Sequence, residues 1–186
     1  MLPLAFNLNG RRALVLGAGR VGAKKTRQLL EAGASVDVIA ESVVADMPSG
    51  IESLTVRRFR AGDLAKYWLV VSAIGDPEVN GRIVEEASRR RIWLNVVDDP
   101  DRSTFFFTAL HRAGEVVVSV STQGSSPALA KEIRDIVSRV LPGNVSDVAQ
   151  RLREERRLIH AEGLSTEHRD WHSRVLALLQ DIGSSA

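Results

Sequence analysis

The sequence has 186 residues, of which 44% are hydrophobic and 26% are charged, as in an ordinary globular protein with a buried core. It has no cysteine, which excludes disulfide bonds, thiolate nucleophiles and cysteine-bound metal centres. The formal charge of +2 and the pI of about 9.4 give a mild preference for anionic ligands, and no nucleic-acid partner is expected. There is no signal-peptide pattern and no apolar run of the roughly 18 to 20 residues that span a membrane, so we expect a cytoplasmic protein without a membrane partner.

Short apolar runs alternate with helix-forming segments through the first half of the chain. The run Ala13–Leu16 is typical of a strand buried on both faces, and Ala32-Gly33 ends the helix-forming segment that follows it. Strands that alternate with helices predict an α/β fold with a Rossmann-like parallel sheet. The expected strands are 13–16, 35–40, 54–59, 68–74 and 92–97, and the expected helices are 21–31 and 78–90.

The pattern changes after Pro100. Two apolar, β-rich runs joined by Ala113-Gly114 predict a hairpin, and Ser126-Pro127 predicts the N-cap and first turn of a helix. The polar remainder has apolar residues at helical spacing, which predicts a helical C-terminal region. The two runs are 104–112 and 115–122, the helix is expected over 128–141, and the helical region over 145–182.

Gly17, Gly19 and Gly22 form the pattern GxGxxG between the first buried strand and the first helix. Glycines in this context permit a tight turn, close approach of the main chain to a pyrophosphate, and close helix–strand packing. The helix N-terminus also favours the phosphate charge. The pattern therefore predicts a dinucleotide site, and a tight turn in a domain without a ligand is the alternative.

Glu41 is the candidate for the acidic residue that holds the adenosine ribose, because Ala40 occupies the expected end of the second strand. An exposed glutamate after a strand is also commonly just solvated. No arginine follows closely in the same loop to receive a 2′-phosphate, so NAD is expected in preference to NADP.

Asp98 and Asp99 stand at the C-terminal end of the fifth expected strand, directly after Asn95-Val96-Val97. Open α/β sheets hold ligands and catalytic groups at this edge, which makes Asp98 a candidate functional carboxylate. Asp99-Pro100 is also typical of a turn, so a purely structural role is the alternative.

The segment from Thr122 to Pro127 ends a strand in hydroxyl groups, a glycine and a helix N-terminus. Such a segment presents hydrogen-bond donors to ligand carboxylates, although helix capping explains much of it. His168 and His172 are four residues apart, but without a third ligand nearby a solvated helix face is favoured over a metal site.

Four motifs in this order resemble the precorrin-2 dehydrogenase / sirohydrochlorin ferrochelatase family, which includes the N-terminal part of sirohaem synthase. The likeness covers about residues 1–142, and NVVD together with STxGxSPALA is more specific than the glycine pattern. The motifs are NGRR at 9–12, GAGRVGAKKTRQLLEAGASV at 17–36, NVVDDP at 95–100 and VSVSTQGSSPALAKEIR at 118–134.

The resemblance implies NAD-dependent removal of two hydrogens from precorrin-2 to give sirohydrochlorin, by a homodimer. It implies that Asp98 is essential and that Thr122 lies near the active site. This sequence departs from the family pattern at two positions: Thr122 replaces the serine of some members, and Gln123 replaces a residue that is often glycine. The implied cofactor contacts are Arg20, Val21, Glu41 and Ser42, and the candidate substrate-binding residues are Asn95, Thr122, Gly124 and Ser126.

The expected domains are an NAD-binding Rossmann domain over 1–102, a dimerisation region over 103–143 and a helical domain over 144–186. Two alternatives to a simple dehydrogenase stay open. In a bifunctional enzyme the same site also inserts ferrous iron as a substrate, with Asp98 accepting protons from the pyrrole nitrogens. In an NAD-sensing module the cofactor is a signal and no turnover occurs. No bound metal cofactor is expected.

Overall fold

The computed structural model describes residues 2–181, and the chain divides into two compact units, residues 1–107 and 108–186. Residues 182–186, which end the expected helical domain over 144–186, lie outside the described part. None of the helices within residues 2–181 combines the length and apolar character that crossing a bilayer requires.

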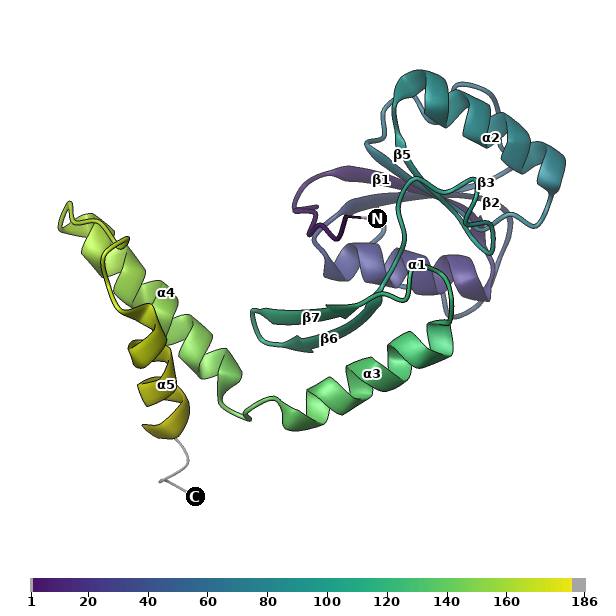
Figure 1. The fold of residues 1–186 in the computed structure, drawn as a ribbon. Helices are drawn as coiled ribbons and strands as arrows, with labels where there is room; N and C mark the ends of the chain where they lie inside the picture. The colour runs from purple at the N-terminus through teal and green to yellow at the C-terminus, as the bar shows by residue number, and fades with distance from the viewer. Residues whose placement is uncertain (1, 182–186) are drawn as a thin grey trace. The chain divides into compact units, whose positions relative to one another are not determined.

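The first unit contains a sheet of five parallel strands in the order β3-β2-β1-β4-β5. Its central strands are apolar on both faces, because helices cover both sides (Figure 1). The predicted α/β fold with a Rossmann-like parallel sheet is confirmed. The strands are β1 (Arg12–Ala18), β2 (Ser35–Val43), β3 (Ser53–Val56), β4 (Leu69–Ser72) and β5 (Trp93–Val96).

The helices α1 (Arg20–Glu31) and α2 (Pro77–Arg90) lie on opposite faces of this sheet (Figure 1). Successive residues of β1 serve the two sides: Leu14 and Leu16 join the core that includes Ile83 of α2, while Ala13 and Val15 join the core that includes Leu29 of α1. The alternation explains why the β1 sequence is a continuous apolar run.

Two strand predictions need correction. The second strand does not end at Ala40 but continues to Val43, because a bulge lets Ala18 of β1 pair with Val43. The expected hairpin strand over 104–112 is wrong in its first half: residues 104–108 are not in a strand, and Phe105 and Phe107 pack against the core beside α1.

The segment 103–105 instead runs along the outer edge of β5. The Leu94 carbonyl accepts from the Thr104 amide at 2.7 Å, and the Leu94 amide donates to Thr104 Oγ1 at 2.8 Å. The Val96 amide donates to Ser103 Oγ at 2.9 Å. The side chains of the segment thus complete the hydrogen bonding of an edge strand.

The second unit begins with the antiparallel hairpin of β6 (Ala109–Ala113) and β7 (Val116–Val120), and α3 (Pro127–Val140) packs against it. Ser126 caps α3 as predicted, since its hydroxyl accepts from the Leu129 amide. The helices α4 (Val145–Ala161) and α5 (Trp171–Asp181) pack on one another.

Asp37 is a buried carboxylate at the amino-terminal side of the sheet, with 2% of its surface exposed. Burial alone would raise its pKa, but hydrogen bonds from Ser53, Arg12 and Tyr67 outweigh burial and lower the pKa below its ordinary value. Arg12 Nη2 lies 2.5 Å from the carboxylate, and the Ser53 hydroxyl donates to its other oxygen. This cluster ties β1, β2 and β3 together.

We expect Asp37→Asn to lower the free energy of unfolding by about 2 kcal/mol at pH 7, because a charge-assisted partner of Arg12 is lost. The ionised Asp37 stabilises the fold above the unfolded pKa of about 3.9, and that contribution disappears as the pH falls through the lower folded pKa. Urea unfolding at pH 7 and pH 3 should therefore show a difference between variant and wild type that shrinks in acid.

The exposed carboxylate of Asp46 provides the control, and Asp46→Asn should change stability by less than about 0.5 kcal/mol. An Asp37→Asn difference of equal size at both pH values would contradict the role of its charge.

Candidate functional site

The glycine turn after β1 can be built only with glycine at two of its positions. Gly17 has a φ of +96°, and a Cβ there would lie 2.7 Å from the carbonyl oxygen of Ala73 at the end of β4. A Cβ on Gly22 would lie 1.9 Å from the Gly17 carbonyl oxygen. These two residues therefore let α1 start directly against the carboxyl ends of β1 and β4.

Gly19 differs from its two neighbours, since no atom lies within 4 Å of the position of a Cβ on it. It is the N-cap of α1, and no side chain caps the helix there. The first turn, with Arg20 and Val21 both exposed, contains no acidic residue. Amide donors, an open approach and an uncapped helix N-terminus fit a pyrophosphate group, which is the fit that a dinucleotide requires.

Glu41 and Ser42 lie within β2, in its bulge, rather than after the strand as expected. Between the pairs Leu16–Ile39 and Ala18–Val43, β1 passes one residue and β2 passes three, so Glu41 and Ser42 come beside the glycine turn. Both are exposed. This position fits the predicted contact with the adenosine ribose.

The structure adds an arginine that the sequence argument for NAD did not consider. No arginine follows Glu41 in its own loop, but Arg58, just beyond the end of β3, donates from Nε to Glu41 Oε2 at 3.0 Å. The position predicted to contact the adenosine ribose therefore has a guanidinium group as well as a carboxylate.

Asp98 occupies a tight turn at the carboxyl end of β5, with a φ of +61° and an exposed side chain. The Asp99 amide donates to the Val96 carbonyl, and Ser103 Oγ donates to the Asp99 carbonyl at 2.8 Å. Aspartate is among the residues that tolerate the left-handed region, and the bonds to either side hold it there. The carboxylate is thus presented at the ligand-binding edge of the sheet.

Asn95 was predicted to bind substrate, but the structure favours a supporting role. The residue is 8% exposed, and its Nδ2 donates to the Phe105 carbonyl at 3.1 Å. Its amide therefore fixes the segment that also carries Ser103, which holds the Asp98 turn.

Lys25 of α1 is a residue that the sequence analysis missed. Its Nζ lies 3.7 Å from the centroid of the Phe107 ring, a cation–π contact. Burial and, to a lesser extent, the neighbouring charge of Lys24 lower the pKa of Lys25 to about 8, and the Asp98 carboxylate opposes the shift. The signal was present in the sequence, because position 25 lies on the inward face of the helix, between Gly22 and Leu29.

Thr122, Gly124 and Ser126 belong to the second unit and form the turn before α3. Thr122 Oγ1 donates to the Ser126 carbonyl at 3.0 Å and accepts from the Ser126 amide at 3.1 Å. Gly124 has a φ of +86°. The Thr122 hydroxyl is therefore used within the turn and the Ser126 hydroxyl caps α3, and a role in substrate binding stays a prediction.

The prediction that His168 and His172 lie on one solvated helix face is wrong. His168 lies in the turn before α5, and His172 lies within α5. Within residues 2–181, no group of three histidine, aspartate or glutamate side chains is arranged to hold a metal ion.

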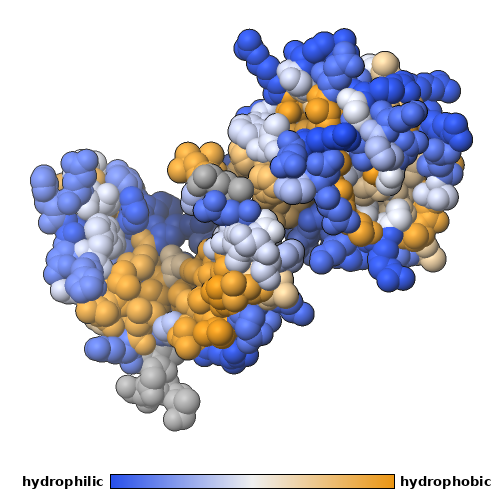
Figure 2. All heavy atoms as spheres, turned by 45° about the vertical axis from the view of Figure 1, so that its right-hand side comes forward, coloured by the Kyte–Doolittle hydropathy of each residue, from blue (hydrophilic) through white to orange (hydrophobic). Residues whose placement is uncertain are grey.

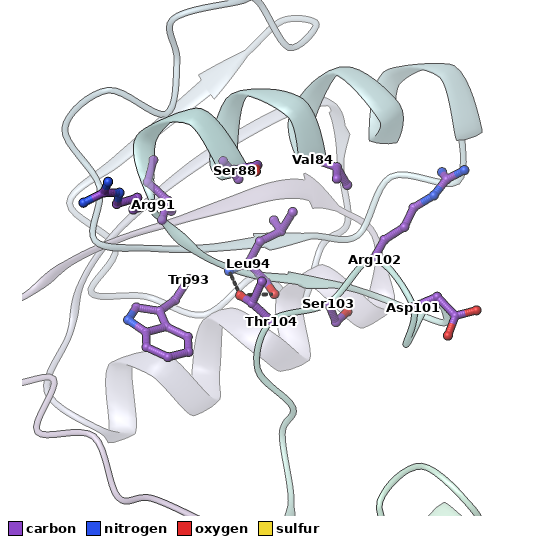
Figure 3. A pocket seen from close by; sticks show the side chains of 11 residues that line it. Val84, Ser88, Arg91, Trp93, Leu94, Asp101, Arg102, Ser103 and Thr104 are labelled. Atoms are coloured by element: carbon purple, nitrogen blue, oxygen red, sulfur yellow. Dashed lines mark hydrogen bonds between the residues drawn. The ribbon is translucent and has the colours of Figure 1, made fainter. Parts of the chain in front are cut away.

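A pocket of about 470 Å³ lies beside the C-terminal half of α2 (Figure 3), and none of its lining residues belongs to the glycine turn. Its floor is β5 and its rim is the segment that carries Arg102 and Thr104. It is distinct from the cofactor position inferred above. The lining residues are Val84, Ala87, Ser88, Arg91, Ile92, Trp93, Leu94, Asp101, Arg102, Ser103 and Thr104.

The parallel sheet, the glycine turn against β4 and the open helix N-terminus define a dinucleotide-binding protein of the Rossmann type. Residues 4–109 match a family described as putative NAD(P)-binding, and the chain belongs to this family. The match confirms the predicted class of cofactor.

The relatives with similar sequences include sirohaem synthases. The chain is 37% identical over 150 residues to a sirohaem synthase of Tolumonas auensis, and 32% identical over 182 residues to sirohaem synthase 2 of Aeromonas hydrophila. These matches cover 80% and 97% of this chain but 32% and 36% of the relatives, so the chain spans about a third of their length.

The solved structure of SirC, a precorrin-2 dehydrogenase, is similar over nearly the whole chain. It superimposes with a TM-score of 0.72 at 26% identity, covering 98% of this chain and 89% of SirC. The resemblance to the precorrin-2 dehydrogenase family, inferred from the four motifs, is thereby confirmed.

Lys25 generates a prediction about stability. Its pKa rises from about 8 in the fold to 10.5 in the unfolded chain, so the unfolded state binds more protons between these values and the free energy of unfolding increases with pH there. We expect Lys25→Met to remove this increase. Urea unfolding of wild type and variant at pH 7, 8.5 and 10 measures it.

Lys24→Met, which changes the exposed neighbour, is the control and should retain most of the wild-type slope, because burial is the larger cause of the Lys25 shift. If Lys25→Met and wild type gain stability equally across this range, Lys25 is not the desolvated group.

Proposed function

We propose that the chain catalyses the NAD-dependent oxidation of precorrin-2 to sirohydrochlorin. The observation that carries the proposal is the exposed Asp98 carboxylate, held in a left-handed turn at the same edge of the sheet as the glycine turn. The agreement in fold with a precorrin-2 dehydrogenase over most of both chains supports the choice of substrate.

When bound, NAD supplies the acceptor for the hydride. The amides around Gly19 bind the pyrophosphate, and Glu41 accepts from a ribose hydroxyl. The oxidation removes a proton as well as a hydride, and the Asp98 carboxylate oxygen accepts that proton as general base. Lys25 contributes a positive charge near Asp98.

A second activity would use the same carboxylate. In a ferrochelatase, ferrous iron enters the macrocycle as a substrate while Asp98 accepts protons from the pyrrole nitrogens. The sirohaem synthase relatives favour keeping this alternative. An NAD-sensing module without turnover is less favoured, because it would not require a carboxylate presented at the ligand edge.

We further propose that the chain forms a homodimer through the second unit. Apolar residues at helical spacing on α3 are exposed, with Leu129 at 52%, Ile136 at 47% and Val140 at 73%. Figure 2 shows apolar surface gathered over this unit. Exposed apolar surface of this kind marks an interaction site, so a second copy covering α3 would bury it.

We expect Asp98→Asn to lower the rate of precorrin-2 oxidation by about 100- to 10,000-fold, because a general base is lost. Asparagine keeps the tolerance for a positive φ, so the turn should fold. The assay mixes protein, NAD and precorrin-2, follows NADH and the pigment spectrum, and then adds ferrous ion to detect chelation.

Two measurements keep this prediction specific. NAD affinity of Asp98→Asn should stay within about twofold of wild type, well below the tenfold change that 1.4 kcal/mol produces. Asp101→Asn, an exposed carboxylate in the following turn, should oxidise precorrin-2 at the wild-type rate. Near-normal turnover by folded Asp98→Asn would show that the proton goes elsewhere.

We expect light scattering after size exclusion to give twice the chain mass of 20.3 kDa. Ile136→Glu should yield monomer, because a charge in an apolar interface is costly. Lys131→Glu, at an exposed position outside the apolar row, should remain dimeric. A fully active wild-type monomer at micromolar concentration would remove the dimer from the proposal.

A further inference from the structure

Arg58 places a guanidinium group beside the Glu41 carboxylate, at the proposed adenosine end of the site. The Arg57 amide donates to the Ala40 carbonyl at 2.9 Å, which continues the pairing of β3 with β2 to the carboxyl edge. Arg58 comes next, and its Nε donates to Glu41 Oε2 at 3.0 Å. Their exposed fractions of 84% and 63% show that burial fixes neither side chain.

The other arginines of this segment are less suited than Arg58 to bind a ligand beside Glu41. Arg57 donates two hydrogen bonds to the Asp63 carboxylate, of 2.7 and 2.8 Å. Arg60 is exposed but forms no ion pair with Glu41. No hydrogen bond joins the terminal nitrogens of Arg58 to any other residue in the described range 2–181. Arg58 therefore keeps donors for a ligand.

A carboxylate and a guanidinium select different adenosine riboses. The carboxylate accepts from the free 2′-hydroxyl of NAD and repels a 2′-phosphate, whereas a nearby arginine accommodates the phosphate of NADP. Arginine binds phosphate oxygens through paired, charge-assisted hydrogen bonds. An exposed ion pair such as Glu41–Arg58 is weak, so little is lost when it opens.

We propose that Arg58 is a specificity-determining residue that allows this site to bind NADP as well as NAD. In the presence of a 2′-hydroxyl, Arg58 remains paired with Glu41, and Glu41 holds the ribose. In the presence of a 2′-phosphate, Glu41 turns away and the guanidinium of Arg58 binds the phosphate. The inference rests on the proposed NAD site, but it concerns which nucleotide the site accepts and not the reaction.

The test is calorimetric titration of the full chain with NAD and NADP separately, which needs no turnover. Wild type should bind both, with NADP weaker by no more than about tenfold, a difference of 1.4 kcal/mol. Arg58→Ala should weaken NADP by a further factor of about 5 to 10 and leave NAD within about twofold, because only the phosphate loses a charged partner. Glu41→Gln should strengthen NADP relative to NAD.

Arg60→Ala is the matched control, since it removes the same charge two residues away from an equally exposed position. It should leave the ratio of the two affinities unchanged, and circular dichroism checks the folding of each variant. NAD binding without detectable NADP binding, or an Arg58→Ala variant that weakens both nucleotides equally, would overturn the role of Arg58. Failure to bind either nucleotide would instead overturn the proposed cofactor site, and the inference with it.

Discussion

The close contact between the start of α1 and the carboxyl ends of β1 and β4 determines the rest of the site. A single methyl group on Gly22 would lie 1.9 Å from the Gly17 carbonyl oxygen, so the helix cannot begin this close with any other residue. Because it does begin there, its N-terminus opens beside Gly19 and its second turn brings Lys25 onto the Phe107 ring. One steric fit thus positions both the uncapped amides at the start of α1 and a desolvated cation.

Sequence reasoning succeeded where structure follows from local pattern. The apolar run of β1, the glycine turn and the Ser126 cap of α3 each depend on neighbours within a few residues, and each was predicted correctly. Sequence reasoning failed where the structure of a segment depends on contacts with residues far away in the chain. The extension of β2 to Val43 depends on a bulge opposite β1. Phe105 and Phe107 are apolar because they pack against the core of the first unit, not because they form a strand.

The same distinction applies to the site. The spacing alone was enough to find Gly17, Gly19 and Gly22, because a turn is formed by residues that are close together in the sequence. Arg58 could not, since it is 17 positions from Glu41 and reaches it only through the pairing of β2 with β3. Asn95 was expected to bind substrate because it is a polar residue at the ligand edge; its amide donates to the Phe105 carbonyl, and the binding role stays a prediction.

The segment that runs along β5 has a consequence for how the first unit meets other molecules. An unpaired edge strand offers a row of amides and carbonyls to any extended peptide, and association by strand addition is a common route to aggregation. Here the Leu94 amide and carbonyl and the Val96 amide are already bonded to Thr104 and Ser103. The same hydroxyl group of Ser103 that fixes the Asp98 turn therefore also closes this side of the sheet to a foreign strand.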